Sequence, residues 1–111
     1  MARVAIGRKD YGQALEQAAK AIELDRNNAD AYQVQGAAHA FRQDFKGAVT
    51  SLERAVAIDP SNAYAHYQLG LSQYRLKRYD RTIIHFEKFL QLAPNAPEAG
   101  QVRSILRTVK G

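Results

Sequence analysis

The stretch LERAVAIDPSNAYAHYQLG, residues 52–70, decides the fold of this chain because much of its pattern returns later. The stretch HFEKFLQLAPNAPEAG, residues 85–100, has the same order of an apolar residue, Glu, a basic residue, further apolar residues, then Pro and Asn. When the chain is aligned with itself at an offset of 34 residues, Glu53 meets Glu87 and Pro60 meets Pro94. A period of this length indicates an array of stacked repeats.

Apolar and small residues keep the same period over most of the chain. The aligned sets are Tyr11, Phe45 and Tyr79; Ala14, Ala48 and Thr82; Ala18, Leu52 and Phe86; Ile22, Val56 and Leu90; and Gly36 with Gly70. Within a repeat, the apolar residues recur at steps of three and four residues, which gives each helix a stripe that a neighbour must cover. We therefore predict an all-α fold with two helices per repeat, and we expect Phe45 and Leu52 to be buried at the seam between helices.

Capping and turn residues set the predicted helix limits. Pro60 and Pro94 interrupt the pattern, because proline disfavours helical geometry in the preceding residue and has no amide hydrogen to donate. The residues placed to cap a following helix are Asp10, Asn28, Asp44, Asn62 and Asn95. The predicted helices span residues 2–8, 11–25, 29–42, 45–58, 63–76, 79–92 and 96–109, with no strand.

These repeated positions resemble the tetratricopeptide repeat family, whose unit is a helix-turn-helix of 34 residues. The matching residues are Tyr32, Gly36, Phe45, Ala48, Leu52, Ala55 and Pro60 in one unit and Leu69, Gly70, Tyr79, Phe86 and Pro94 in the next. The resemblance implies a right-handed superhelical array of antiparallel helix pairs. It divides the single domain, 1–111, into a partial repeat at 1–28, full repeats at 29–62 and 63–96, and a capping helix at 97–111.

The two ends of the predicted array differ. The closing helix carries polar positions and a terminal Lys-Gly stop, whereas the first unit lacks several of its starting positions. We therefore expect Val4 and Ile6 to be poorly covered, and we interpret the chain as a piece of a larger protein that can self-associate through its incomplete first repeat.

Composition and motifs argue against several classes of function. With 46% hydrophobic and 24% charged residues the chain can form a core, and it shows no secretory signal pattern and no apolar run that could span a membrane, which slightly favours a cytoplasmic protein. Cysteine is absent, and His39, His66 and His85 form no metal-ligand spacing. No phosphate-binding glycine loop or nucleophile motif is present. We expect no enzyme, no metal and no cofactor.

Charge leaves a wider choice of partner. The formal net charge of +5 and the basic stretch YRLKRYDR, residues 74–81, are compatible with acidic peptides, anionic lipid or nucleic acid. The simpler interpretation is that these cations complement the negative end of a helix dipole. Nucleic acid is the weaker candidate, because aromatic residues are not interleaved with the cations as stacking platforms.

The helix expected over 63–76 is apolar on two sides. Leu69 and Leu76 are predicted to be buried, whereas Tyr67 and its neighbours on the second side should stay at least partly accessible. The resemblance implies that the first helix of each unit lines a concave groove for extended or helical peptides. It places there Gln33, Val34, Ala37, Phe41, Tyr64, Tyr67, Gln68, Leu71, Tyr74 and Arg75. The alternative is that Tyr67 and Leu71 pack on the closing helix.

One subtype of the family binds chaperone tails of the EEVD type through a clamp of Lys and Asn side chains. The matching positions here are Gln33, Ala37, Tyr67 and Leu71, so the resemblance disfavours that ligand. We predict a protein-interaction module that binds a peptide or partner helix, which the net charge suggests is acidic. The alternative is a structural module that assembles through its ends, by self-association or within a longer array.

Overall fold

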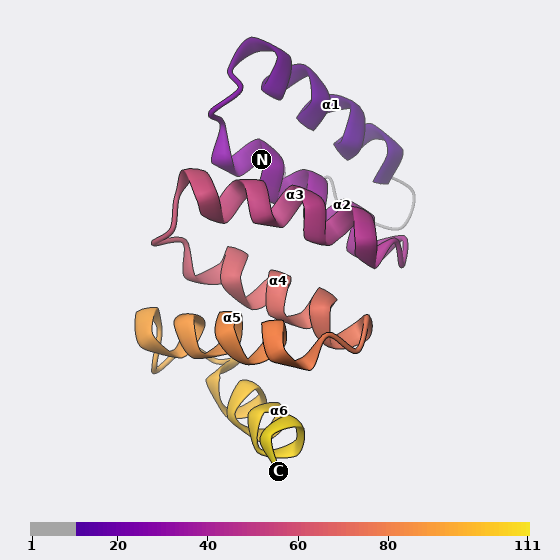
Figure 1. Ribbon diagram of the computed structural model, residues 1–111. Helices are drawn as coiled ribbons and strands as arrows, with labels where there is room; N and C mark the ends of the chain where they lie inside the picture. Colours follow the sequence, from indigo (N-terminus) through magenta and orange to yellow (C-terminus); the bar gives the residue numbers. More distant parts are fainter. Residues whose placement is uncertain (1–10) are drawn as a thin grey trace.

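The computed structural model describes residues 11–111, which form six α-helices and no strand. The first five helices lie successively antiparallel and stack along one direction (Figure 1), and the principal extents are 42 × 25 × 23 Å. The helices are α1 (Tyr11–Leu24), α2 (Ala29–Phe41), α3 (Phe45–Ile58), α4 (Ala63–Arg75), α5 (Tyr79–Leu92) and α6 (Ala99–Lys110). The predicted all-helical repeat fold is confirmed.

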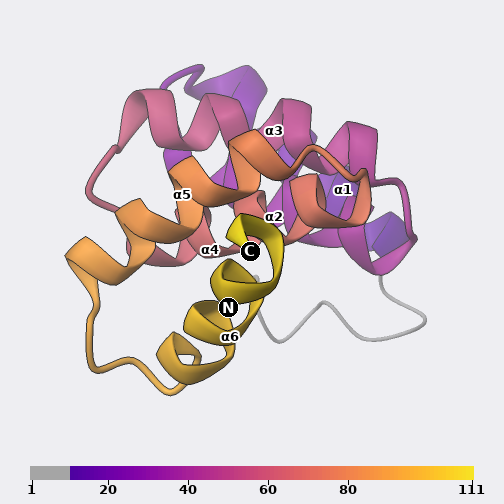
Figure 2. The ribbon, with the colours of Figure 1, turned by 60° about the horizontal axis from the view of Figure 1, so that its bottom comes forward.

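The helices pair in the order of the sequence. α2 packs on α3 and α4 packs on α5, and the α3–α4 contact joins the two units. The turns that join α2 to α3 and α4 to α5 lie on the same side of the stack, which is on the right in Figure 1. Figure 2 shows that α6 lies across the far end of the array, where it contacts α5. Each helix thus packs mainly on its neighbours in sequence, as in a repeat array in which each unit covers the next.

Side-chain caps begin three of these helices as the sequence predicts. The Oδ1 atoms of Asn28 and Asn62 accept hydrogen bonds from the third residue of the following segment, at 3.0 and 3.1 Å. Asp44 Oδ1 accepts from the Gly47 amide at 3.0 Å. Each cap satisfies one of the amide hydrogens that the first helical turn leaves without a partner.

Two glycines allow the helices within each unit to approach closely. A Cβ atom on Gly36 would lie 2.5 Å from Leu52 Cγ, and one on Gly70 would lie 2.4 Å from Phe86 Cδ1. Neither separation is physically possible without movement, so the side chain of α3 or α5 occupies the space that a larger residue on α2 or α4 would need.

Within residues 11–111 the core contains two apolar clusters. One contains Ala48, Val49, Leu52 and Leu69 and lies where α3 meets α4. The second contains Phe86, Phe89, Val102 and Leu106 and joins α5 to α6. The second cluster explains why α6 stays on the array, and a 2.6 Å ion pair between Lys110 and Glu87 adds to that contact at the surface.

Two residues that were predicted to be buried are only partly buried. Phe45 is the first residue of α3, and its side chain is only half-buried. Leu76 follows the last residue of α4 and is partly buried against the first cluster. Leu52 and Leu69 are fully buried, as predicted.

The start of the last helix was also predicted wrongly. Helix α6 begins at Ala99 rather than at residue 96, its N-cap is Glu98, and Asn95 lies in a turn. Pro97 restricts Ala96 to non-helical geometry, so the helix cannot start as early as the capping pattern of Asn95 suggested. The remaining helix limits agree with the prediction to within one residue.

Some predictions fall on residues that lie outside the described part of the chain. They are the helix at 2–8, the cap at Asp10, and the exposure of Val4 and Ile6. Among the helices of residues 11–111, none is long and apolar enough to cross a bilayer.

Candidate functional site

A hollow of about 610 Å³ opens between α2 and α4. Helix α4 supplies one long side of it, the end of α2 and the start of α3 supply the other, and α6 contributes a single residue. The lining residues are Ala37, Ala40, Phe41, Gln43, Phe45, Tyr64, Tyr67, Gln68, Leu71, Ser72, Arg75 and Gln101. We call this site the hollow.

Most of the residues that the resemblance assigned to a groove line the hollow. They are Ala37, Phe41, Tyr64, Tyr67, Gln68, Leu71 and Arg75. Gln33, Val34 and Tyr74 are half-buried and do not line it. The ring of Tyr74 packs instead on Tyr79, with centroids 5.9 Å apart.

Sequence reasoning missed five lining residues: Ala40, Gln43, Phe45, Ser72 and Gln101. Phe45 was assigned to the core, because its apolar position repeats with the period of buried residues. Gln101 comes from α6, and a helix beyond the last repeat has no earlier copy from which its orientation could be deduced. Ala40 and Ser72 follow the same α2 and α4 faces as the predicted residues, so a wider helical face would have included them.

Tyr67 joins the hollow to the core. Its ring stacks on the Phe86 ring with centroids 6.2 Å apart, and it is tilted against the Phe89 ring with centroids 5.2 Å apart. Tyr67 and Leu71 both pack against the cluster that contains residues of α6, so these side chains line the hollow and also pack toward the closing helix. Burial raises the pKa of the Tyr67 hydroxyl above its ordinary value, and the Glu98 carboxylate raises it further, so this hydroxyl remains protonated at neutral pH.

A chain of amide side chains crosses the floor between the two units. Asn62 Oδ1 accepts from the Ala65 amide, so Asn62 Nδ2 must be the donor that reaches Gln33 Oε1 at 2.8 Å. Gln33 Nε2 therefore donates to Gln68 Oε1 at 3.2 Å. This order leaves Gln68 Nε2 without a hydrogen-bond partner in the described part of the chain, so Gln68 presents hydrogen-bond donors to the hollow.

A cation lies at one end of the hollow. The Arg75 guanidinium carbon lies 5.5 Å from the centroid of the Phe45 ring, which holds the side chain by a cation–π contact. The equivalent positions one repeat earlier are Tyr11 and Phe41, whose rings stack with centroids 5.7 Å apart. The second repeat thus replaces an aromatic ring with a charged group at the edge of the hollow.

The other end of the hollow is tied to the segment before α6. The Tyr64 hydroxyl donates to Glu98 Oε2 at 2.6 Å, and the Tyr64 ring packs edge-on against Tyr67 with centroids 5.6 Å apart. Tyr64 is nevertheless 38% exposed, and Phe41 across the hollow is 58% exposed. Both rings therefore offer apolar surface to a ligand.

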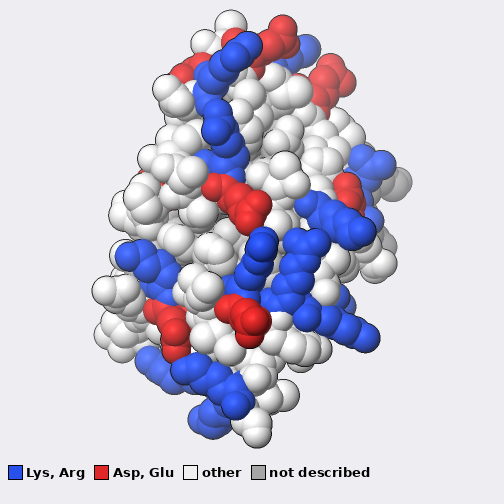
Figure 3. Space-filling view, viewed as in Figure 1, with Lys and Arg blue, Asp and Glu red and all other residues white. Residues whose placement is uncertain are grey.

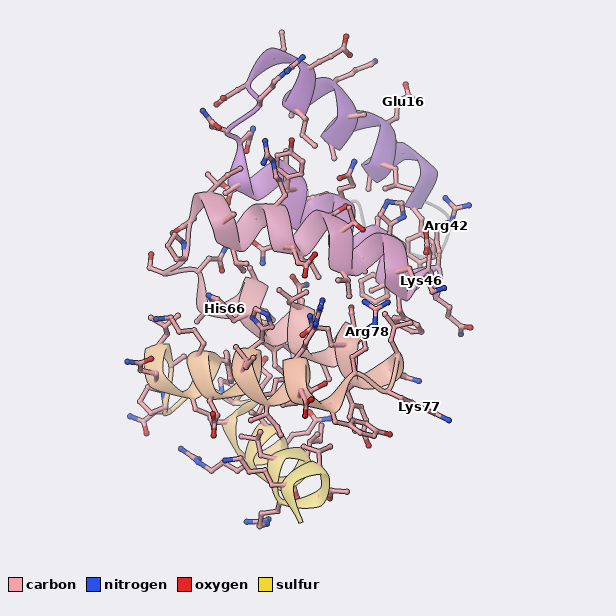
Figure 4. All side chains as sticks on the ribbon, viewed as in Figure 1. Glu16, Arg42, Lys46, His66, Lys77 and Arg78 are labelled. Atoms are coloured by element: carbon pink, nitrogen blue, oxygen red, sulfur yellow. The ribbon has the colours of Figure 1, made fainter. Side chains whose placement is uncertain are left out.

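Two histidines, 19 residues apart in sequence, meet between α4 and α5. His66 Nδ1 lies 3.3 Å from His85 Nδ1, and His66 Nε2 lies 2.9 Å from the Pro60 carbonyl oxygen. That oxygen can only accept, so in a neutral pair His66 donates from Nε2 and accepts from His85 at Nδ1. Burial, the neighbouring His66 and then Arg81 lower the pKa of His85 to about 4. Figure 4 shows His66 between these helices.

This histidine pair has no third ligand. No group of three or more His, Cys, Asp or Glu side chains that could hold a metal ion occurs within residues 11–111. We therefore interpret the pair as a packing contact of the second unit. This contact could not be predicted from the sequence, because no short spacing joins the two positions.

Comparisons with known proteins agree with the architecture. A family model described as "TPR repeat" matches residues 36–77, and one described as "Tetratricopeptide repeat" matches residues 63–96. A solved structure, the Arabidopsis OM64 TPR domain, superposes with a TM-score of 0.88 at 27% identity, covering 96% of this chain and 88% of that domain.

Two curated proteins are similar in sequence. Anaphase-promoting complex subunit 3 of Schizosaccharomyces pombe is 29% identical over 78% of this chain, and Small glutamine-rich tetratricopeptide repeat-containing protein 2 of Saccharomyces cerevisiae is 31% identical over 86%. The chain spans only 13% of the first protein's length and 28% of the second's. The similarity therefore concerns only a part of each of these two proteins.

Proposed function

Because this chain belongs to the tetratricopeptide repeat family, we propose that it is a non-enzymatic protein-interaction module that binds a peptide or partner helix in the hollow. The observation that carries the proposal is the exposure of aromatic side chains around a concave, mainly apolar site. Phe41 and Tyr64 remain 58% and 38% exposed at this site. Aromatic side chains of this kind are the usual anchors of protein interfaces.

The polar groups of the hollow favour a ligand that accepts hydrogen bonds. Gln68 presents donors, Arg75 contributes a positive charge, and none of the lining residues is Asp or Glu. Main-chain carbonyl groups and carboxylates of a peptide would pair with these groups. We therefore extend the proposal to a peptide that carries acidic residues.

We also propose that the ligand is not a chaperone tail of the EEVD type. The positions that would supply the Lys and Asn clamp are Gln33, Ala37, Tyr67 and Leu71, none of which is cationic. Gln33 is also engaged by Asn62 and Gln68, which leaves at most one of its amide hydrogens for a terminal carboxylate.

The chemistry of the lining supports a binding role rather than catalysis. Among the described residues that line the hollow there is no Asp, Glu, His, Lys or Cys. Ser72 is the one aliphatic hydroxyl among them, and no lining carboxylate or imidazole is present to activate it as a nucleophile. The hollow therefore offers shape, apolar area and hydrogen-bond donors.

The experiment that tests this proposal begins with selection of peptides from a display library against the folded chain. Binding of the selected peptides is then measured for Phe41→Ala and for Ile84→Ala. Ile84 is a matched control because it is 61% exposed on α5 and does not line the hollow. We expect Phe41→Ala to weaken binding by more than about 1 kcal/mol, as loss of an aromatic anchor does, and Ile84→Ala to leave it unchanged.

The opposite ranking of these two variants would contradict the proposal. If no peptide is selected and the chain self-associates with an affinity that Phe41→Ala does not alter, assembly through the ends is the better account. Sedimentation over a range of protein concentrations measures that self-association.

A further inference from the structure

Basic side chains gather on the side of the array where the helix ends meet, at the turns from α2 to α3 and from α4 to α5. The cations of these two turns are Arg42, Lys46, Arg75, Lys77 and Arg78. Figure 4 shows four of them, Arg42, Lys46, Lys77 and Arg78, on the same side of the molecule, and the space-filling view in Figure 3 has a group of Lys and Arg side chains there. We call this surface the basic end.

Little of this charge is neutralised by the protein itself. Among the described residues, Arg42, Lys46, Lys77 and Arg78 form no ion pair, whereas the adjacent Arg81 lies 3.8 Å from Glu53. The carboxylates within the two turns are Asp44 and Asp80, so five cations less two carboxylates leave a net charge of +3. Asp44 is already engaged by the Gly47 amide and by His39 Nδ1 at 3.4 Å.

The two turns have the same backbone conformation. Gln43 and Lys77, one period apart, both adopt the left-handed region, with φ of 64° and 62°. This conformation is uncommon for residues other than glycine, so each turn has a defined geometry rather than that of a flexible linker. The cations beside these residues are thus displayed from preformed positions, which lowers the entropic cost of binding.

The basic end is continuous with the hollow. Phe41, Gln43 and Phe45 line the hollow and alternate in sequence with groups of the α2–α3 turn, including Arg42 and Lys46. Arg75 lines the hollow and is the last residue of α4, immediately before the α4–α5 turn. A chain that lies in the hollow and leaves by this end therefore passes over the exposed cations.

We propose that the hollow and the basic end form one docking site for a polypeptide segment in which apolar residues are flanked by a run of Asp or Glu. The apolar residues occupy the hollow, and the acidic run lies over Arg42, Lys46, Lys77 and Arg78. This inference rests on the proposed function, because it assigns to the ligand of the hollow a second, acidic part. Charge complementarity makes the contact specific and speeds association.

A polypeptide fits this surface better than a nucleic acid. The cations form a compact group interrupted by Asp44 and Asp80, whereas a phosphate backbone favours a long unbroken stripe. Tyr74 and Tyr79, on either side of the α4–α5 turn, pack on one another with centroids 5.9 Å apart. The apolar hollow beside the cations suits side chains of Leu or Phe.

The test uses three fluorescent probes of equal length. One peptide contains Leu and Phe followed by a run of Glu, the second replaces each Glu with Gln, and the third probe is oligothymidylate. Binding is measured for the wild-type chain, for the double variant Arg42→Glu/Lys77→Glu, and for Arg26→Glu/Arg107→Glu. The last variant has the same change in charge at exposed sites away from the basic end, and circular dichroism checks that both variants fold.

We expect the Glu peptide to bind the wild-type chain more tightly than the Gln peptide. Arg42→Glu/Lys77→Glu should weaken the Glu peptide by about fivefold or more and the Gln peptide hardly at all, while the control variant stays within about twofold. The advantage of the Glu peptide should shrink as salt rises, because these groups are exposed. When the wild-type chain is titrated with the Glu peptide, backbone amide chemical shifts should change in the hollow and in residues 42–46 and 75–78.

Three results would overturn the inference, and they separate its failure from that of the proposed function. Equal binding of the Glu and Gln peptides, with shifts in the hollow, removes the acidic part and leaves the proposed function standing. Shifts confined to the two turns, with none in the hollow, contradict both. Tighter binding of oligothymidylate at the same turns identifies the basic end as a surface for nucleic acid.

Discussion

The α2–α3 unit and the α4–α5 unit have helices of matching lengths but different polar contacts. Both begin with an Asn cap, and both place a glycine of the first helix against a large side chain of the second, Leu52 in one and Phe86 in the other. In both units a 2.8 Å hydrogen bond closes the turn between the two helices. The Asp44 amide donates to the His39 carbonyl oxygen in one, and the Arg78 amide donates to the Gln73 carbonyl oxygen in the other.

The two units differ in the contacts of their polar side chains. In the first, Ser51 donates to Gln35 at 2.8 Å, and His39 lies 3.4 Å from Asp44. In the second, the position of Ser51 is His85, which contacts His66, and the positions of His39 and Asp44 are Gln73 and Arg78. Gln73 is fully buried with neither side-chain polar atom hydrogen-bonded, and α5 has no side-chain cap.

The residues that repeat therefore define the fold, and the residues that do not repeat define the polar contacts of each unit. Apolar and glycine positions must repeat because each helix pair buries the same seam. Polar positions are free to differ as long as their partners differ with them. The second unit has kept the seam while leaving one buried polar group unpaired.

The largest effect is expected for side chains at the two seams. Leu52→Ala and Phe86→Ala should each lower the free energy of unfolding by about 2–5 kcal/mol, because both side chains are fully buried. Phe45→Ala should cost clearly less, because its ring is half-buried at the edge of the hollow. Urea denaturation measures all three, and an equal loss for Phe45→Ala would show that the helix pairs depend on that ring more than its burial indicates.

The glycine contacts should distinguish the two seams by the stiffness of the facing side chain. Gly70→Ala should destabilise by about 1–3 kcal/mol, since the rigid Phe86 ring cannot move aside, and Gly36→Ala should cost less because Leu52 can change rotamer. Gly12→Ala is the matched control, because a Cβ there meets nothing within 4 Å. Thermal melts in which all three variants behave alike would contradict this explanation.

How far the sequence predicts the molecule follows from the same distinction. The helices and the caps at Asn28, Asp44 and Asn62 could be predicted, because each has a local signal that repeats. The first residue of α6 could not, because Pro97 altered a cap pattern that no earlier repeat tests. The partners of polar side chains were also hidden: Gln33 bonds Gln68 across two helices, and no local pattern encodes that contact.

The unpaired Gln73 offers a way to make the second unit more stable. Gln73→Leu removes two buried polar atoms without a partner and keeps a similar volume, so the free energy of unfolding should rise by about 1–2 kcal/mol. The same change one repeat earlier, His39→Leu, removes a contact with Asp44 and should not stabilise. Chemical denaturation of the two variants checks this contrast. A loss of stability for Gln73→Leu would mean that the Gln73 amide has a partner, such as a buried water molecule.

The histidine pair predicts a smaller, pH-dependent difference between the units. The folded pKa of His85, about 4, lies below its ordinary value of 6.5, so the folded state favours the neutral ring. Its contribution to stability is therefore present above pH 6.5 and is lost as the pH falls from 6.5 toward about 4. Arg81, Lys88 and Glu87 also lie near this pair, and their charges modify the size of the effect.

His85→Ser isolates this contribution, because serine is the residue one repeat earlier, at Ser51. Thermal midpoints of wild type and variant are compared between about pH 7 and about pH 4.5. The wild-type midpoint should fall more steeply with pH than that of the variant. Parallel curves would remove the pair as a source of pH dependence.

The most direct test of the account maps where a display-selected peptide binds, by following backbone amide chemical shifts during titration. The shifts should concentrate on residues that line the hollow between the two units, such as Gln68, Leu71 and Gln101. Residues on the exposed side of α5, such as Ile84 and Lys88, should not change. Shifts confined to α5, with the hollow unchanged, would contradict the central claim that the hollow is the binding site.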